Sequence, residues 1–406
     1  MGSDCRTSAS EGKALYDHRM GAVLTSLAWV VAIGLALTTL DVLIGARRIR
    51  PLSTLPSIPT QLKASVVVAA RNEARGIAPA MRSLLALEYP DLEIIVVNDR
   101  STDETGRILA QIQAEHPRLR VVTVTSLPDG WLGKNHALAA GASVARGDVL
   151  LFTDADVVFE PTSLARAVAY LDSEDLDHLT ALPDVTVRGV ALTALVTTFG
   201  VLFGIYSRPW KARDPKSRHH IGVGAFNLLR MSAYQHIGTH AAIALRPDDD
   251  LRLAREVKRA GLRTDVVHGR DMVAVEWYTS VTEMIDGLMK NAFAGLNYSV
   301  LQLVGSTLAL VAFNLWPCVG IVAASGAAQR LAGVSTLLLA TLVLAHTRAA
   351  RTSPGYVLLH PFGVLVFIYI LWRSAILALS RGAIIWRDTS YPLTRLRASQ
   401  PAPRLR

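Results

Sequence analysis

Hydrophobic positions along the chain form long uninterrupted runs near both ends and short runs in between. Residues 21–44 are apolar except for Asp41 near the end of the run, and this run exceeds the roughly 20 residues that a membrane-spanning helix needs. Three more long runs occupy residues 300–324, 331–346 and 355–379. The middle one is short for a bilayer, which favours a tilted, re-entrant or extended segment. The pattern predicts a transmembrane helix at 21–44 and two or three spans within residues 300–380.

From residue 64 to about residue 298 the pattern changes to short β-branched runs that alternate with stretches of helical spacing. The strands predicted from these runs are residues 64–70, 92–98, 119–125 and 148–154, and the helices between them are residues 76–87, 105–116 and 135–145. Continuous apolar strands that alternate with helices are typical of a mostly parallel sheet covered on both faces. We therefore expect an α/β domain over residues 64–298, with ligands at the carboxyl ends of its strands.

A further apolar run, residues 190–206, lies inside this α/β region. It is long enough to be considered as a membrane span. A single crossing there would place residues 64–189 and 207–298 on opposite sides of the membrane. We therefore interpret the run as an interfacial or buried helix near the entrance to the ligand site.

The composition agrees with membrane segments, because 51% of the residues are hydrophobic, which is more than an ordinary soluble domain contains. The formal net charge of +9 is compatible with nucleic-acid binding or with a basic membrane face. The arginines crowd around the apolar segments, so we expect a membrane partner and no nucleic acid. Two cysteines, Cys5 and Cys318, support neither a disulfide framework nor a cysteine metal site.

Charge around the long runs sets the expected topology. The basic cluster at residues 46–50 follows the first run, and the positive-inside rule then places the α/β domain, residues 64–298, in the cytoplasm of a multi-pass protein of the cell membrane. Residues 1–20 are expected to form an N-terminal tail. Three C-terminal spans would leave the basic tail, residues 381–406, outside, although its arginines favour the inside; those are Arg381, Arg387, Arg395, Arg397, Arg404 and Arg406. One of the three segments would then not cross.

Polar residues follow the first two predicted strands. Arg71, Asn72 and Glu73 stand at the end of the first strand, where such side chains hydrogen-bond a base or a ribose. The alternative is an ordinary helix cap, which is the preferred explanation when this motif is taken alone. Asp99 ends the second strand and suits a ribose hydroxyl or a base edge. The residues that follow it, 101–105, are interpreted as a helix cap.

The loop at residues 127–138, LPDGWLGKNHAL, contains Pro, Gly and Trp and leads into a predicted helix. Lys134 and Asn135 open that helix, whose N-terminus favours an anion such as a diphosphate. The alternative is a surface turn with a solvated lysine.

Asp154 and Asp156 follow the fourth predicted strand in LLFTDADVVFEP. Two carboxylates at this spacing can share one divalent cation, because Mg²⁺ and Mn²⁺ take oxygen ligands, usually one or two carboxylates together with substrate phosphates. Such pairs also occur by chance in loops. Their place at the end of a strand in a nucleotide-type sheet makes a metal site the preferred interpretation.

Three acids, Asp248, Asp249 and Asp250, precede an amphipathic helical pattern at residues 251–261. Acids at a helix N-terminus are favoured by capping and by the helix dipole, which is a purely structural explanation. The functional interpretation makes one of them a general base for an acceptor hydroxyl.

Taken in order, the segments resemble membrane-associated family 2 glycosyltransferases of the GT-A fold. The resemblance is carried by VVVAARNE, IIVVNDRSTDET, GWLGKNHAL, LLFTDADVVF and DDDLRLAREVKRAG, and it covers about residues 64–300. It implies a Rossmann-like nucleotide-sugar-binding domain and a divalent cation, Mg²⁺ or Mn²⁺. Donor contacts are implied at Glu73, Asp99 and Lys134, with metal and diphosphate binding at Asp154 and Asp156. Asp249 and Asp250 match the catalytic base best, and Asp250 is the preferred residue.

The chain departs from the processive members of that family. Their Q-x-x-R-W motif is absent from residues 276–293, EWYTSVTEMIDGLMKNAF. The region is more similar to bacterial enzymes that glycosylate carotenoid or hopanoid-type lipids, in which a G-x-x-K-N stretch follows. This makes Lys290 a candidate donor contact, with a snorkelling lysine at the membrane edge as the alternative. Residues 382–393 also resemble a C-terminal segment of these enzymes, in which Trp386 and Tyr391 are otherwise interfacial anchors.

The expected activity is therefore inverting transfer of a sugar, of the hexosyltransferase type, from a nucleotide-sugar donor to a membrane lipid. Arg71 and Asn72 complete the expected donor contacts, and Asp250 deprotonates the acceptor. Two rival interpretations are a processive membrane polysaccharide synthase and a non-catalytic membrane protein that binds a nucleotide sugar.

Overall fold

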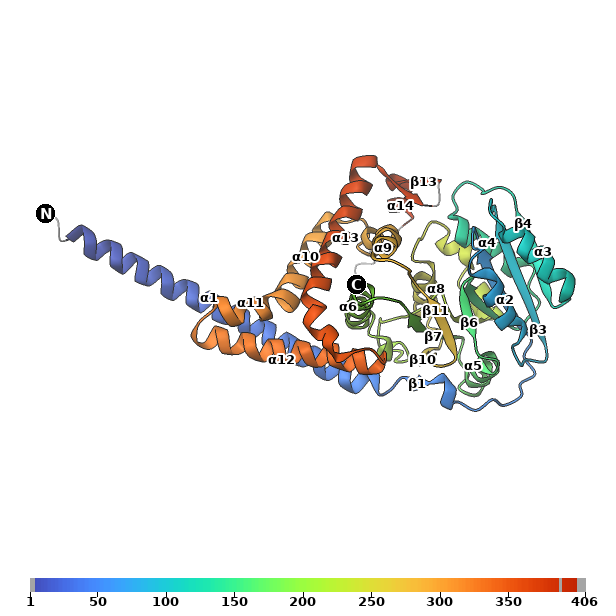
Figure 1. Cartoon of the computed structure of the whole chain (residues 1–406), viewed down its shortest axis with the longest axis horizontal. Helices are drawn as coiled ribbons and strands as arrows, with labels where there is room; N and C mark the ends of the chain where they lie inside the picture. Colours follow the sequence, from blue (N-terminus) through green and yellow to red (C-terminus); the bar gives the residue numbers. More distant parts are fainter. Residues whose placement is uncertain (1–3, 387–388, 400–406) are drawn as a thin grey trace. The chain divides into compact units, whose positions relative to one another are not determined.

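The computed structural model describes residues 4–386 and 389–399, and the chain divides into two compact units (Figure 1). We call one the apolar unit, residues 1–44, 193–205 and 299–372, and the other the catalytic unit, residues 45–192, 206–298 and 373–406. Parts of the two expected tails, namely residues 1–3, 387–388 and 400–406 with Arg387, Arg404 and Arg406, lie outside the described residues.

The catalytic unit is built on an eight-stranded sheet with the order β1-β10-β7-β9-β5-β2-β3-β4. Its strands are β1 (Arg50–Pro51), β2 (Ala64–Ala70), β3 (Leu92–Asp99), β4 (Leu119–Val124), β5 (Val149–Asp154), β7 (His178–Leu182), β9 (Asn227–Arg230) and β10 (Thr264–His268). The pairs among β2 to β5 are parallel, and β9 runs antiparallel between β5 and β7. The mostly parallel α/β sheet and all four predicted strands are confirmed.

Helices cover both faces of this sheet, which explains why β2 is apolar along its whole length. Val66 and Val68 belong to the core cluster that contains Met81 of α2. The residue between them, Val67, belongs to a second cluster with Leu138 of α4 and Leu253 of α8. Alternate side chains of a strand point to opposite faces, so both faces are buried. The helices are α2 (Ile77–Leu85), α3 (Thr105–Glu115), α4 (Gly133–Ser143), α5 (Ser163–Ser173), α7 (Met231–His236) and α8 (Asp249–Arg259).

Smaller elements complete the catalytic unit. The strands β6 (Val157–Phe159), β11 (Val273–Glu276) and β8 (Asp184–Thr186) form a second sheet. Three 3-10 helices are η1 (Leu52–Thr54), η2 (Pro209–Lys211) and η3 (His240–Ile243), and the helix α9 is Val281–Gly295. The end of the chain folds into the hairpin β12 (Ala383–Trp386) and β13 (Thr389–Pro392), followed by α14 (Leu393–Ala398). The described part of the expected basic tail is therefore structured and belongs to the catalytic unit.

Long helices make up the apolar unit. They are α1 (Asp4–Ala46), α6 (Val190–Ser207), α10 (Val300–Leu310), α11 (Trp316–Ala323), α12 (Gly326–Ala349) and α13 (His360–Arg381); a π-helical segment, Val311–Leu315, joins α10 to α11, and the 3-10 helix η5 (Pro354–Leu359) precedes α13. By length and composition, five helical segments among the described residues could cross a membrane. Residues 4–20, expected as a tail, instead continue α1. The short run predicted at 331–346 is extended at both ends in α12, which has 24 residues.

The sheet restricts what α6 can do. Strand β7 precedes α6 in the chain and β9 follows it, yet β7 pairs with both β9 and β10. The segments on either side of α6 therefore lie on the same side of any membrane, and one complete crossing by α6 is excluded. Within the apolar unit α6 packs closely on later helices, because a Cβ on Gly363 would lie 2.3 Å from Oγ1 of Thr198. Its expected interfacial position stays a prediction.

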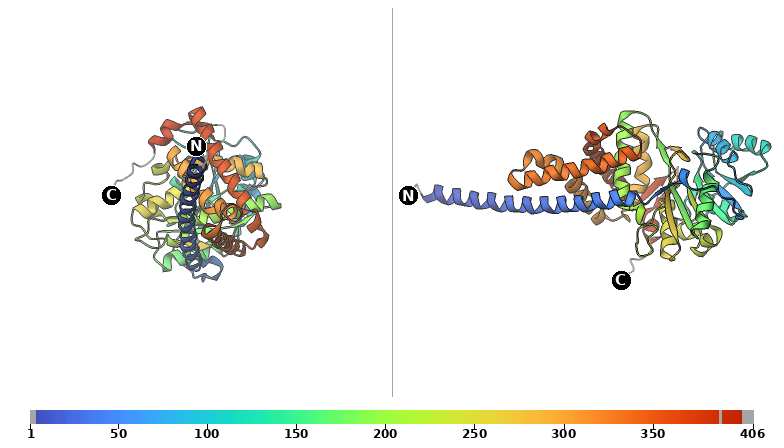
Figure 2. Two further views of the ribbon diagram at one scale, coloured as in Figure 1. Left: turned by 90° about the vertical axis from the view of Figure 1, so that its left-hand side faces the viewer. Right: turned by 90° about the horizontal axis from the view of Figure 1, so that it is seen from below.

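The C-terminal hairpin restricts the number of crossings further. Arg373 donates to Asp286 of α9 at 2.8 Å, and Arg397 donates to the carbonyl of Tyr298 at 3.1 Å. Residues at 298 and after 373 thus belong to one folded body, so the chain between them crosses a membrane an even number of times. An even number agrees with the expectation that one of the three C-terminal segments does not cross, and the number of spans stays a prediction. Within the apolar unit, α13 runs across the direction of α12 (Figures 1 and 2).

Candidate active site

Lys134 joins two of the predicted acidic motifs. Its Nζ lies 2.8 Å from Oδ1 of Asp154 and 3.3 Å from Oδ2 of Asp249. Lys134 is near the start of α4, Asp154 is the last residue of β5, and Asp249 is the first residue of α8. Burial opposes the charge on Lys134, but the carboxylates of Asp154 and Asp249 outweigh it and raise the pKa of the lysine above its usual value. The ammonium group is therefore charged and holds the two acids together.

The three consecutive acids before α8 have different partners. Asp248 binds two arginines, Arg246 at 3.1 Å and Arg252 at 2.7 Å, so its carboxylate is neutralised inside the protein. Asp249 is buried, 6% exposed, and lies on Lys134. Asp250 is partly exposed and accepts hydrogen bonds from the backbone N–H of Gly224 at 2.8 Å and of Leu251 at 2.7 Å. The contacts just described pair Asp248 and Asp249 with cationic side chains, whereas those of Asp250 are hydrogen bonds from the backbone.

Electrostatics also distinguishes Asp250. Burial, and then repulsion by the carboxylate of Asp249, raise the pKa of Asp250 to about 7. Burial likewise raises the pKa of Asp249, against the opposing effect of Lys134. A carboxylate that titrates near neutral pH is suited to accept and release a proton in that range. Asp250 thus has the properties of a general base, and Asp249 is the neighbouring carboxylate that raises its pKa.

A small pocket is formed where these residues meet. Its lining consists of Lys134, Leu138, Phe152, Thr153, Asp154, Gly224, Asn227, His240, Asp249 and Asp250. His240 is the other group there that might be considered as a base, but burial lowers its pKa to about 3, and its Nδ1 is 2.9 Å from the hydroxyl of Tyr234. The histidine is therefore a neutral part of the pocket wall.

Two glycines that the sequence analysis did not single out bring the backbone close to the acids. A Cβ on Gly224 would lie 2.7 Å from Oδ2 of Asp154, and a Cβ on Gly222 would lie 2.1 Å from the carbonyl oxygen of Asp250. Any side chain at either position would displace the acid beside it. The signal in the sequence was two glycines spaced by one residue, GVGAF, just before a strand.

Asp156 forms a second acidic group with Asp154 and Glu73. Burial raises the pKa of Asp156 to about 7, and the charges of Asp154 and Glu73 add to this effect. A Cβ on Gly76 would lie 3.2 Å from Cβ of Asp156, so the loop after β2 packs against the acid. A buried carboxylate beside two others is stabilised by a cation.

The donor set at Asp154 and Asp156 fits a divalent cation of the Mg²⁺ or Mn²⁺ type. Among residues 4–386 and 389–399, no group of three or more His, Cys, Asp or Glu is arranged as a metal site. These ions commonly use one or two protein carboxylates, with phosphate oxygens of the substrate as further ligands. The charge of Asp154 is already compensated by Lys134. A bound cation would therefore stabilise the ionised carboxylate of Asp156 more than that of Asp154.

The loop after β2 is tied to the loop after β3. The side-chain oxygen of Asn72 accepts a hydrogen bond from the backbone N–H of Thr102 at 2.8 Å, and the N–H of Glu73 donates to Oγ1 of Thr105 at 2.8 Å. Asn72 therefore has a structural contact at the place where a donor contact was expected. The cap expected from Ser101 or Thr102 is not formed: Glu104 precedes α3 without a side-chain cap bond, and Asp103 instead accepts from the N–H of Thr105 at 3.0 Å. Arg71 is half-buried directly after β2.

Asp99 is held by the residue that follows it. Arg100 donates to both carboxylate oxygens of Asp99, at 2.7 and 2.8 Å, and Asp99 is only 2% exposed. A Cβ on Gly133 would lie 2.7 Å from Oδ2 of Asp99, so the carboxylate stands at the N-terminus of α4. Arg100 was missed by sequence reasoning. Hydrogen bonding to Asp99 raises the pKa of Arg100, and Tyr391 of the C-terminal hairpin contributes to this shift.

Asn135 has a role that its place in the sequence did not reveal. Its side-chain amide donates to the carbonyl oxygens of Ile243 at 2.8 Å and of Arg246 at 2.9 Å. Asn135 is 1% exposed, so it does not contact a diphosphate in solvent. It fixes the segment that leads into the acidic residues before α8. The adjacent Lys134 and Asn135 thus act on the same acidic segment by different contacts.

Lys290 lies on α9, whose N-terminus is capped by Ser280 through a bond from the N–H of Glu283 at 3.1 Å. Lys290 is half-buried, and its positive charge lowers the pKa of Asp249 against the effect of burial. The lysine therefore acts on the acidic group of the pocket.

Comparisons with known proteins show what the chain is similar to. Residues 65–238 match the family described as Glycosyl transferase family 2. The chain is 21% identical over 342 residues to the 4,4'-diaponeurosporenoate glycosyltransferase of Staphylococcus aureus, a match that covers 82% of this chain and 88% of the relative. It is 33% identical over 115 residues to an uncharacterised glycosyltransferase of Nostoc sp., which is 28% of this chain and 34% of that relative.

A solved structure supports the fold. The mannosyltransferase of Pyrobaculum calidifontis, determined in complex with GDP-Man and Mn²⁺, is similar with a TM-score of 0.51 and 18% identity. The similarity covers 87% of this chain and 98% of that one. The parallel sheet, the acids at its strand ends and the family match lead to one conclusion: residues 65–238 match a glycosyltransferase family 2 domain, and the sheet has the GT-A fold.

Proposed function

We propose that the protein is an inverting glycosyltransferase that moves a sugar from a nucleotide-sugar donor to a membrane lipid at the cytoplasmic face of the cell membrane. The observation that carries the proposal is the meeting of Lys134, Asp154 and Asp249 in one pocket, with Asp250 beside them. This pocket contains the ammonium group of Lys134, the carboxylate of Asp154 that is suited to a metal ion, and the carboxylate of Asp250 that can act as a base. Each of these groups assists transfer from a diphosphate leaving group: the cations neutralise the leaving group and the base accepts the acceptor's proton.

The donor would bind across the carboxyl ends of β2 to β5. Asp99, with Arg100 fixing its orientation, is suited to a nucleoside hydroxyl or base edge at the N-terminus of α4. Lys134 lies between this position and the acids of β5, where the diphosphate would lie. A divalent cation held by Asp156 and Asp154 would supply neutralisation of the leaving diphosphate. Lys290 would add positive charge from α9.

Asp250 would act as the base. Its carboxylate takes the proton of the acceptor hydroxyl, and the resulting oxygen attacks the anomeric carbon from the face opposite the diphosphate. A new carbon–oxygen bond forms as the bond to the diphosphate oxygen breaks, so the configuration at the anomeric carbon is inverted. The backbone N–H groups of Gly224 and Leu251 hold the carboxylate in place during the proton transfer.

A lipid acceptor is supported by two observations. Five helical segments of the described chain are long and apolar enough for a membrane; one precedes the sheet in the sequence, one is inserted in it and three follow it. The Staphylococcus aureus relative, which matches along most of its length, is named for transfer to 4,4'-diaponeurosporenoate. The acceptor hydroxyl would then reach Asp250 from the membrane side.

The proposal is tested with the purified full-length protein, a radiolabelled nucleotide sugar and extracted membrane lipids. Asp250→Asn should lower transfer by about 100-fold or more, the usual contribution of a general base, while donor binding measured by calorimetry remains. Asp129→Asn, on an exposed loop, is the matched control and should behave as the wild type. Turnover by Asp250→Asn at the rate of the control would exclude Asp250 as the base, and a long polymeric product would favour the polysaccharide synthase instead.

A further inference from the structure

An open pocket outside the candidate active site is lined by basic side chains. Arg48, Lys211, Lys216 and Arg218 contribute four cations to its wall, against one carboxylate from Asp214, and Trp210 forms part of the same wall. None of the donor-site acids or Lys134 lines it. Arg48, Lys216 and Arg218 are exposed, so their charges face a space that a ligand can enter.

The pocket lies where two apolar helices end. Arg48 comes directly after α1, which ends at Ala46, and Trp210 follows α6, which ends at Ser207. A Cβ on Gly45 would lie 2.3 Å from the Trp210 ring, so the indole packs flat against the last turn of α1. A tryptophan and basic side chains just beyond apolar helices are typical of the level of lipid headgroups.

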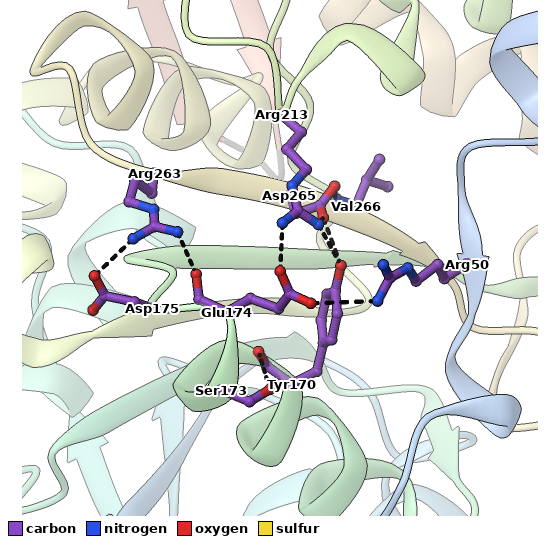
Figure 3. Close-up of polar contacts among 9 residues, drawn as sticks. All are labelled: Arg50, Tyr170, Ser173, Glu174, Asp175, Arg213, Arg263, Asp265 and Val266. Atoms are coloured by element: carbon purple, nitrogen blue, oxygen red, sulfur yellow. Dashed lines mark hydrogen bonds and ion pairs between the residues drawn. The ribbon is translucent and has the colours of Figure 1, made fainter.

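The segment that forms the pocket is firmly attached to the sheet. Lys258 of α8 donates to the carbonyl oxygens of Ala212 at 2.5 Å and Asp214 at 2.6 Å. Arg213 binds Glu174 at 2.5 Å and Asp265 at 3.0 Å (Figure 3). The backbone that carries Lys211, Lys216 and Arg218 is thereby held from both sides, which makes the pocket preformed.

Two arginines near the pocket, Arg50 and Arg263, form ion pairs within the protein and have a structural role. Arg50 pairs with Glu174 at 3.4 Å, and Arg263 pairs with Asp175 at 2.7 Å (Figure 3). These contacts fasten β1 and the start of β10 to α5 and the residues after it. The pocket brings four other cations to one wall, and those of Arg48, Lys216 and Arg218 are exposed. A cluster of cations around one cavity is suited to a phosphate group, whose oxygens accept several charge-assisted hydrogen bonds.

We propose that this pocket binds the phosphate headgroup of an anionic membrane lipid. Arg48 and the cations of residues 211–218 contact the phosphate, and Trp210 lies at the boundary between headgroup and acyl chains. The attraction of basic residues to anionic lipids amounts to about a fivefold gain in binding for each residue near the surface. The pocket would therefore hold one such lipid beside the ends of α1 and α6.

The experiment uses the full-length protein in detergent micelles and native mass spectrometry. The added ligands are dioctanoyl phosphatidylglycerol, dioctanoyl phosphatidylcholine and inorganic phosphate. The test variant is Lys216→Gln/Arg218→Gln, and the matched control is Arg118→Gln/Arg146→Gln, which removes two exposed charges elsewhere on the catalytic unit. A charge-conserving variant, Lys216→Arg/Arg218→Lys, reports on folding.

The wild type, the matched control and the charge-conserving variant are expected to retain phosphatidylglycerol. The test variant should bind it roughly 25-fold more weakly, since two charges are removed, with an unchanged melting temperature. Equal retention by test and control variants would overturn the proposal. Equal binding of phosphatidylcholine would overturn the preference for an anionic lipid. Displacement of the lipid by millimolar inorganic phosphate would identify the pocket as a free-phosphate site instead.

Discussion

The Nζ of Lys134 lies between Oδ1 of Asp154, at 2.8 Å, and Oδ2 of Asp249, at 3.3 Å. One lysine thus links the end of β5 to the start of α8. Without it, two carboxylates would face each other in a partly buried pocket. This arrangement makes the lysine necessary both for the stability of the site and for its charge.

Replacing Lys134 by Met should therefore affect folding and catalysis together. Removal of one partner from a buried ion pair costs about 3–5 kcal/mol, and we expect a lower melting temperature with transfer reduced at least 100-fold. Lys134→Arg keeps the charge and should recover most of the stability. Calorimetric unfolding and donor binding measure the two effects. Wild-type stability of the Met variant would mean that the ion pairs contribute little.

The rate of transfer should depend on pH through Asp250. Its pKa is raised to about 7, and a base works only when it is deprotonated, so activity should rise with pH up to about 7 and level off above it. The profile of kcat/KM between pH 5.5 and 9 measures this dependence. Asp250→Glu is expected to keep some activity with a shifted profile. A rate that is constant from pH 5.5 to 7 would contradict the assignment.

Asn135 should matter for stability more than for donor affinity. Asn135→Leu removes the side-chain donor to the carbonyl oxygens of Ile243 and Arg246, of which Ile243 keeps the N–H of Arg246, and an unsatisfied buried group costs about 1–3 kcal/mol. The acidic segment before α8 would then be displaced, which lowers kcat. Thermal unfolding and kinetics with a fixed donor test this expectation. A lower donor affinity with unchanged stability would instead indicate direct contact with the donor.

Gly224 should tolerate no side chain. In Gly224→Ala, the new Cβ would lie 2.7 Å from Oδ2 of Asp154 and 3.3 Å from Nζ of Lys134, so the ion pair has to move. We expect transfer to fall by tenfold or more, since small displacements of reacting groups have large effects on rate. The matched control is Gly295→Ala, where nothing lies within 4 Å of the added atom. Equal activities of the two variants would show that the site adapts.

The C-terminal hairpin should lie on the same side of the membrane as the sheet. Contacts of Arg373 with Asp286 and of Arg397 with Tyr298 require this. In a protein whose Cys5 and Cys318 are replaced by Ser, single cysteines at Arg118 and Ser399 should react with a membrane-impermeant maleimide from the same side. Labelling from opposite sides would show that an odd number of segments crosses between Tyr298 and Arg373.

Strands β2, β3, β4 and β5 could be predicted because each contains a run of β-branched or other apolar residues between polar segments. The short strands β7, β9 and β10 could not, since each has only four or five residues. Their pairing depends on contacts far away in the chain, which no local pattern encodes. The same limit applies to Arg100, whose hydrogen bonds to Asp99 depend on the turn after β3.

The sequence by itself determined the α/β domain, the apolar helices at both ends and the acids and lysine at the strand ends. Those features are local. A run of consecutive apolar residues indicates a strand that is buried on both faces, and the polar residue that follows the run marks the end of the strand. Only the tertiary structure decided which acid binds which cation, that Asn135 holds the segment before α8, and that the C-terminal hairpin joins the catalytic unit. Those outcomes depend on long-range packing, in which residues distant in the chain compete for the same partner.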